Sequence, residues 1–187
     1  MVIEADDAEK DRVVGAMMGA EWPTERRFPD VLVADGGSVT YGDLEFSVRS
    51  FGPAESHVDT VWQTASGDLF VGDLVYNNSH AYLADGHAEA WLAALEQLAS
   101  EVAPGQKLYV GHGPPARPEH IAHQRRYFQA FLTALAETRG MDAQDRERHV
   151  LEAIHPLVTS EELLFLTQVS IEPAFTAIHG TGQATVG

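Results

Sequence analysis

The feature that most constrains this chain is the spacing of its apolar residues, which changes partway along from every second position to helical spacing. Between Val39 and Val48, apolar and polar side chains alternate on both sides of a Gly42-Asp43 turn, which is typical of a β-hairpin. The segments TVWQTA and DLFVGDLVY, joined through Ser66-Gly67, predict a second hairpin. Its return strand is apolar enough to be buried on both faces. We therefore expect two hairpins to form the core sheet.

Helical spacing follows the second hairpin. Asp85 is expected to cap a helix from about His87 to Val102, whose apolar stripe packs on the sheet. The short strand KLYV then leads directly into GHGPP, a loop whose glycines and prolines exclude regular structure, so that His112 lies at the end of that strand.

The remaining segments are predicted to be mostly helical. The expected helices span about Pro118 to Thr138, Ala143 to Ile154, and a stretch from Thr159, where Thr159 and Glu162 form a capping box. The helix expected from Pro118 carries an apolar stripe, which should lie in the core or in an oligomer interface. Its residues are Phe128, Phe131, Leu132 and Leu135. A helix is also expected over Ala5 to Ala20, and the tail TGQATVG is expected to be frayed.

These elements predict a single α/β domain of the α+β type over residues 1–187. It comprises a helix and loop over 1–34, a sheet, helix and GHG loop over 35–116, and a helical segment over 117–187.

Charge and composition narrow the function. The net charge of −16, with only 12 Lys and Arg residues, opposes binding to nucleic acid and to anionic membranes. The chain lacks the run of about 18 to 20 apolar residues that a membrane span needs, and its first residues are acidic, unlike a secretory signal. We therefore expect a cytoplasmic protein with a small-molecule substrate. Because the chain has no cysteine and 9 histidines, any metal must be held by His and carboxylate side chains.

Three such donors, His57, Asp73 and His112, lie at or near the ends of predicted strands. Loops at one edge of a sheet converge, so these donors are able to meet in space. Asp73 and His112 each follow a glycine, which lets the backbone come close to a bound ion or ligand. Carboxylate with imidazole suits zinc, iron or manganese, and such a metal generates hydroxide for hydrolysis.

The segments GPAESHVDTVW, LFVGDLVYNNSHAYLADGH and LYVGHGPP, within residues 35–115, resemble the second half of metallo-β-lactamase superfamily proteins. The resemblance implies that His57 binds a first metal, that Asp73 bridges two metals and acts as the catalytic, orienting ligand, and that His112 binds the second. An Asp at the bridging position is similar to the broader hydrolase branch of the superfamily rather than to its antibiotic-degrading enzymes.

The chain departs from this family in one large respect: the HxHxDH motif, which supplies the other ligands, is absent from the sequence. The resemblance therefore implies half of the family's αββα sandwich, in a chain whose upstream part was lost. Of the two zinc ions of the complete site, we expect one weakly held ion or none.

Two functions remain open at this point. The first is an incomplete metal-dependent hydrolase of esters, amides or phosphoesters, in which His80 and Tyr82 contact the substrate. The second is a non-catalytic interaction module, in which a homo-oligomer or a complementing chain covers the exposed sheet. His120 and His123, three residues apart on a helix, are a further pair with chelating spacing.

Overall fold

The computed structural model describes Ala8, residues 11–12, 14–16 and 18–23, Glu25, and residues 27–180. The chain divides into two compact units, Met1–Leu32 and Val33–Gly187. In the first unit, the described residues from 8 to 18 are helical and a 3-10 helix, η1 (Gly19–Glu21), follows. Several residues of the helix predicted over 5–20, and the whole predicted tail over 181–187, lie outside the described residues.

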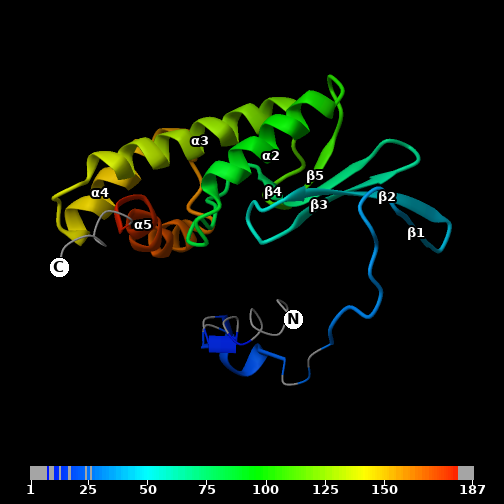
Figure 1. The fold of residues 1–187 in the computed structure, drawn as a ribbon, viewed down its shortest axis with the longest axis horizontal. Coiled ribbons are helices and arrows are strands. Elements are labelled where there is room, and N and C mark those ends of the chain that lie inside the picture. The colour runs from blue at the N-terminus through cyan, green and yellow to red at the C-terminus, as the bar shows by residue number, and fades with distance from the viewer. Residues whose placement is uncertain are drawn as a thin grey trace, which may run out of the picture. The chain divides into compact units, whose positions relative to one another are not determined.

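A five-stranded sheet forms the base of the second unit, with its strands in sequence order (Figure 1). The strands are β1 (Ser38–Tyr41), β2 (Leu44–Gly52), β3 (Asp59–Thr64), β4 (Leu69–Tyr76) and β5 (Leu108–His112). Neighbours from β1 to β4 pair antiparallel, which confirms both predicted hairpins. β5 pairs parallel with β4, as a strand reached through a helical crossover can.

The crossover helix is α2 (Ala88–Glu101), close to its predicted bounds. The predicted cap is wrong: His87 is the N-cap residue, and the helix start has no side-chain cap hydrogen bond. Burial of the stripe explains why the helix forms without a cap, since Trp91, Leu95 and Leu98 are almost fully buried and tertiary packing supplies most helix stability in proteins.

The C-terminal segment contains α3 (Pro118–Glu137), α4 (Ala143–Ile154), η2 (His155–Leu157) and α5 (Leu164–His179). The first two α-helices match the prediction, and Asp142 caps α4 by accepting a hydrogen bond from the Asp145 amide. None of the described helices is long and apolar enough to cross a bilayer.

The predicted start of the last helix is wrong, because α5 begins at Leu164 rather than near Thr159. The backbone amide and hydroxyl of Thr159 both donate to Asn78 Oδ1, which holds this segment against the loop after β4. The Glu162 amide donates to Ser160 Oγ, so the expected capping box with Thr159 does not form. A tertiary contact has therefore displaced a local capping signal.

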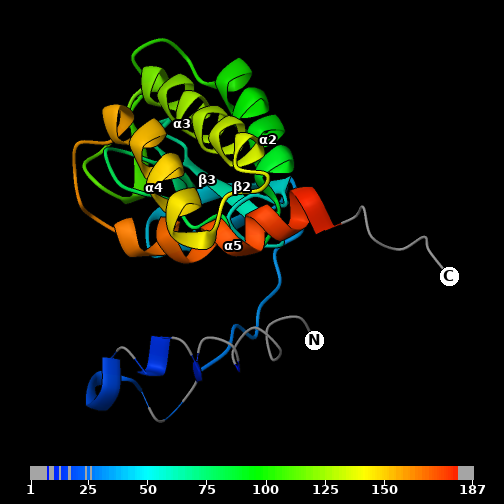
Figure 2. The ribbon, with the colours of Figure 1, turned by 90° about the vertical axis from the view of Figure 1, so that its left-hand side faces the viewer.

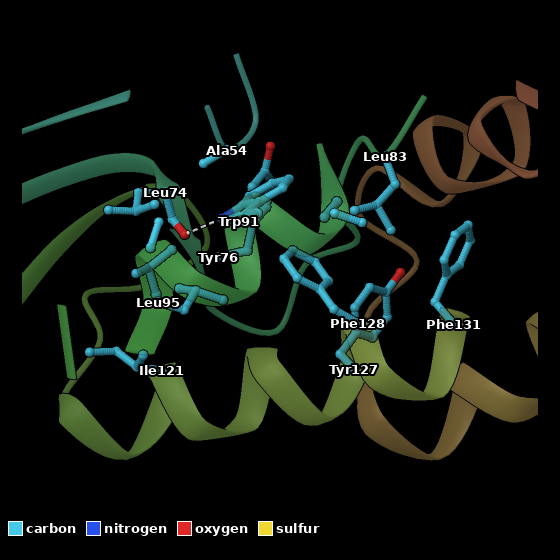
Figure 3. Packing of buried hydrophobic residues seen from close by; sticks show 14 of the residues in the cluster. Ala54, Leu74, Tyr76, Leu83, Trp91, Leu95, Ile121, Tyr127, Phe128 and Phe131 are labelled. Carbon is cyan, nitrogen blue, oxygen red and sulfur yellow. Dashed lines mark hydrogen bonds between the residues drawn. The ribbon is translucent and has the colours of Figure 1, made fainter. Parts of the chain in front are cut away.

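The core lies between the sheet and the helices α2 and α3, which run side by side (Figures 1 and 2). Trp91 and Phe128 meet edge to face with ring centroids 4.5 Å apart, and Trp91 Nε1 donates to the Leu74 carbonyl at 2.9 Å (Figure 3). Phe128, Phe131 and Leu135 are fully buried. The stripe on α3 is therefore core rather than an oligomer seam.

The strand β4 is buried on both faces only in its second half, from Leu74 to Tyr76. In its first half, Leu69 and Val71 join the core, whereas Phe70 is 40% exposed on the opposite face. The expectation of burial along the whole strand is wrong, because α2 and α3 cover one face of the sheet at this point.

Candidate functional site

Asp73 and His112 meet at the edge of the sheet where β4 and β5 end. The two strands are parallel and Tyr76 pairs with His112 in the register, so both strands deliver side chains to the same edge. Asp73 Oδ1 lies 3.5 Å from His112 Nε2, and the two side chains are 39% and 37% exposed. A carboxylate and an imidazole are thus close together and open to solvent.

The glycines on both sides of His112 are required by close packing against β4. A Cβ at Gly111 would lie 1.8 Å from Asp73 Oδ1, and one at Gly113 would lie 1.9 Å from the Asn77 carbonyl oxygen. The space at Gly111 that we expected to serve a bound ligand is therefore occupied by the Asp73 carboxylate. The absence of a side chain at Gly111 is what allows this carboxylate to lie beside His112.

Tyr76 packs against His112, the imidazole of the pair. Its ring stacks on His112 with centroids 5.3 Å apart and planes 18° from parallel. Burial raises the pKa of the Tyr76 phenol far above its usual range, and the nearby carboxylates of Asp73, Glu55 and Asp59 raise this pKa further. Tyr76 therefore stays a neutral phenol that holds the imidazole ring. Sequence reasoning missed this residue, although an aromatic residue three positions after Asp73 on the same strand was a signal for it.

Gln124 on α3 holds the strand that carries Asp73, and it too was missed. Its Oε1 accepts a hydrogen bond from the Tyr76 amide at 2.6 Å, and its Nε2 donates to the Leu74 carbonyl at 3.2 Å. A buried amide side chain thus replaces a missing strand partner at the end of β4. The only sequence signal was a polar residue within the apolar stripe of α3.

His57 lies in the exposed loop between β2 and β3, with its ring 5.3 Å from the ring of His87. Ser56 orders this loop, because its amide and hydroxyl both donate to Asp59 Oδ2. Within the described part of the chain, no three His, Asp or Glu side chains form a group able to hold a metal ion. The structure brings Asp73 and His112 together, and the role of His57 as a further ligand stays a prediction.

The spacing of the Asp73–His112 pair fits two ligands of one metal ion. Ligand atoms at about 2.1 Å from a tetrahedral zinc ion lie about 3.4 Å from each other. The observed separation of 3.5 Å is close to that value. The pair therefore fits two coordination positions, whereas zinc sites in proteins use three or four protein ligands.

His80, one of the two predicted substrate contacts, is buried in a chain of hydrogen bonds. The Thr167 hydroxyl donates to the Ala81 carbonyl, and the Tyr127 hydroxyl lies 3.0 Å from Thr167 Oγ1 and 3.0 Å from His80 Nδ1. Burial lowers the pKa of His80 and raises the pKa of Tyr127 to about 12. Tyr82 is half-buried. Substrate contact by either residue stays a prediction.

The histidines with chelating spacing on α3 have other contacts. His120 Nδ1 accepts a hydrogen bond from the Arg117 amide at the helix start, and His123 Nε2 contacts the Leu157 carbonyl. Both rings thus take part in helix capping or helix packing.

Comparison with known proteins gives matches at the level of structure. No protein-family model matches the chain, and no curated protein matches it in sequence. A metallo-β-lactamase family protein from Thermus thermophilus superposes with a TM-score of 0.62 at 16% identity, over 96% of this chain and 62% of that one.

Two further structures are similar to the chain. A β-lactamase domain protein from Burkholderia ambifaria has a TM-score of 0.56 at 19% identity, covering 93% of this chain and 52% of that one. A metallo-β-lactamase from Pontibacter korlensis has a TM-score of 0.50 at 21% identity, covering 63% and 55% of the two chains. The matches thus span between 52% and 62% of the length of these solved structures.

Proposed function

We propose that this chain, which has part of the metallo-β-lactamase fold, contributes Asp73 and His112 to the metal site of a metal-dependent hydrolase. The observation that carries the proposal is the 3.5 Å separation of Asp73 Oδ1 and His112 Nε2, on the neighbouring parallel strands β4 and β5. The resemblance assigned His57 and His112 to different metals; here both would bind one ion together with Asp73, which would leave a position open for water or substrate, as in catalytic zinc sites.

Each residue at the edge of the sheet has a role in this proposal. Asp73 and His112 bind the ion, and Asp73 also orients the ligands around it. Tyr76 holds the ring of His112 by stacking, and Gly111 leaves the space in which the Asp73 carboxylate lies. A metal bound there would supply hydroxide near neutral pH for attack on an ester, amide or phosphoester. Zinc suits this donor set, and so do iron and manganese.

Metal binding by the purified chain tests the proposal. We expect a titration with Zn²⁺ or Co²⁺, followed by calorimetry, to give one bound ion per chain. Asp73→Asn and His112→Gln are each expected to weaken binding by at least about tenfold, and His57→Gln shows whether the loop supplies a third ligand.

A matched control is available at His149 on α4. Its side chain is 36% exposed and lies 3.1 Å from a carboxylate oxygen of Glu137, so it resembles His112 in exposure and in its partner. His149→Gln is expected to leave metal binding unchanged.

Turnover of ester, thioester and phosphoester substrates is the second measurement. Activity should require added metal and should fall in Asp73→Asn and His112→Gln but not in His149→Gln. A chain that binds no metal and shows the same rate in all variants would contradict the proposal.

A further inference from the structure

A cavity of about 350 Å³ lies where the loop after β4 meets the C-terminal helices. Leu151 and Ile154 of α4 and Leu164 of α5 give it an aliphatic wall. A volume of this size is at the lower end of the range for sites that bind small organic molecules. Within the described part of the chain, none of the three predicted metal ligands lines the cavity. The cavity is therefore a separate feature from the metal site proposed above.

Hydrogen bonds between distant segments hold the cavity together. The His80 amide donates to the Glu162 carbonyl at 3.0 Å. The amide and hydroxyl of Thr159 both donate to Asn78 Oδ1. The loop after β4 is thus bound at two points to the segment that leads into α5, so that His80 lies close to the turn carrying Glu161.

The polar side chains of the cavity are acidic or imidazole groups. They are His80, Glu152, His155 and Glu161, and no Lys or Arg is among the lining residues. Among the described residues, neither Glu152 nor Glu161 has an ion-pair or hydrogen-bond partner for its carboxylate, whereas several glutamates elsewhere on the helices are paired with Arg, His or Gln. The cavity therefore has negative charge that this part of the protein does not neutralise.

His80 adds no positive charge to the cavity. Its side chain is buried, and burial lowers its pKa, although the Glu161 carboxylate opposes this shift. A histidine whose pKa lies below about 6.5 is neutral at pH 7. The Tyr127 hydroxyl, 3.0 Å from His80 Nδ1, fixes the position of the ring.

We propose that this cavity binds a protonated amine carried on a short aliphatic chain. The carboxylates of Glu152 and Glu161 would pair with the ammonium group through charge-assisted hydrogen bonds. The aliphatic chain would lie against the apolar wall of the cavity and leave water there. An anion would meet two carboxylates and no cation. A bare metal ion fits poorly, because no three His, Asp or Glu side chains among the described residues form a group able to hold one.

The amine site does not depend on the metal site. Binding of the amine should persist in the presence of a chelator and in His112→Gln. Failure of one proposal is therefore distinguishable from failure of the other.

Two small molecules that differ only in their head group provide the test. Pentylamine is protonated near neutral pH, whereas pentanol has the same aliphatic chain and no charge. Each is titrated into the isotope-labelled full chain, and the backbone amide signals are followed by NMR. We expect pentylamine to shift the signals of Leu151, His155 and Leu164 with a Kd of about 1 mM. Pentanol should bind at least about tenfold more weakly.

Salt and chain length separate the two parts of the interaction. Added salt should weaken the binding of pentylamine, because it screens the attraction between the ammonium group and the carboxylates. From propylamine to pentylamine, the affinity should rise about two- to fourfold for each added methylene group that the apolar wall covers.

Three variants that each remove one negative charge show where the amine binds. Glu152→Gln and Glu161→Gln change the cavity and keep the shape of the side chain. Glu89→Gln is the matched control, because Glu89 is exposed in the first turn of α2, outside the cavity. The two cavity variants should each weaken the binding of pentylamine at least about threefold, and the control should leave it unchanged. Equal urea midpoints for the three variants would show that the fold is intact.

Three results would overturn the proposal. One is a titration in which pentylamine gives no saturable shift at the residues of the cavity. Another is pentanol binding as tightly as pentylamine. The third is Glu89→Gln weakening the binding as much as the cavity variants do, because the amine would then be attracted only by the net charge of −16.

Discussion

Replacing the glycines beside His112 one at a time separates the geometry of the site from the stability of the fold. An added Cβ at Gly111 would lie 1.8 Å from Asp73 Oδ1 and 3.2 Å from the Asp73 amide nitrogen. An added Cβ at Gly113 would lie 1.9 Å from the Asn77 carbonyl oxygen, in backbone with a φ of +87°. The first conflict is mainly with the end of a side chain, and the second is with backbone.

The magnitudes follow from which atoms are able to move. The Asp73 carboxylate is 39% exposed and can rotate into solvent, so Gly111→Ala should cost about 1 kcal/mol, or about 2–4 °C in Tm. Gly113→Ala adds strain in the left-handed region to overpacking against backbone. Its expected cost is about 3 kcal/mol or more. Only Gly111→Ala should therefore give a folded chain in which the Asp73 carboxylate no longer lies beside His112.

Urea unfolding monitored by tryptophan fluorescence measures both costs. In an Asp73→Ala background, the clash at Gly111 is relieved, so most of the penalty of Gly111→Ala should disappear while that of Gly113→Ala remains. Gly111→Ala in the wild-type background should also weaken metal binding as much as Asp73→Asn does. Equal costs for the two glycines in both backgrounds would refute the assignment of Gly111 to the carboxylate.

Two further predictions concern stability. Phe128→Ala should lower the free energy of unfolding in urea by about 3–5 kcal/mol, because Phe128 is fully buried against Trp91. Phe165 is 41% exposed, so Phe165→Ala should lower it by less than about 1 kcal/mol. Similar losses in the two variants would contradict the packing. Burial lowers the pKa of His80, so between this lowered pKa and about 6.5 the unfolded chain binds a proton that the folded chain does not. Stability should therefore fall as the pH drops below about 6.5, less steeply in His80→Asn, and parallel pH profiles of the two proteins would count against a neutral buried His80.

Local signals were sufficient for most of the secondary structure. The Gly42-Asp43 turn joins β1 and β2, and the helix expected over about Ala143 to Ile154 matches the bounds of α4. The same kind of signal failed near Thr159, where bonds to Asn78, 81 residues away in the chain, take up the groups that would have capped a helix. A contact of that range leaves no local trace in the sequence.

The sequence likewise predicted only part of the candidate site. Sequence order and motif resemblance identified His57, Asp73 and His112, but they did not show which of the three meet. The meeting of Asp73 and His112 depends on the parallel register of β4 and β5, which α2 and its packing establish. Tyr76 and Gln124 were missed because their roles come from contacts with β5 and β4 rather than from spacing.

By itself, the sequence determined the two hairpins, the helices near the sheet and the metallo-β-lactamase resemblance, because periodicity and turn residues act over a few positions. Only the tertiary structure decided that a carboxylate and an imidazole 39 residues apart lie 3.5 Å from each other with Gly111 making room between them. It also decided that the helices cover one face of the sheet, while on the other face Phe70 packs against Phe46 and Tyr109. Both outcomes depend on strand register and packing between distant segments, which the local pattern of residues does not contain.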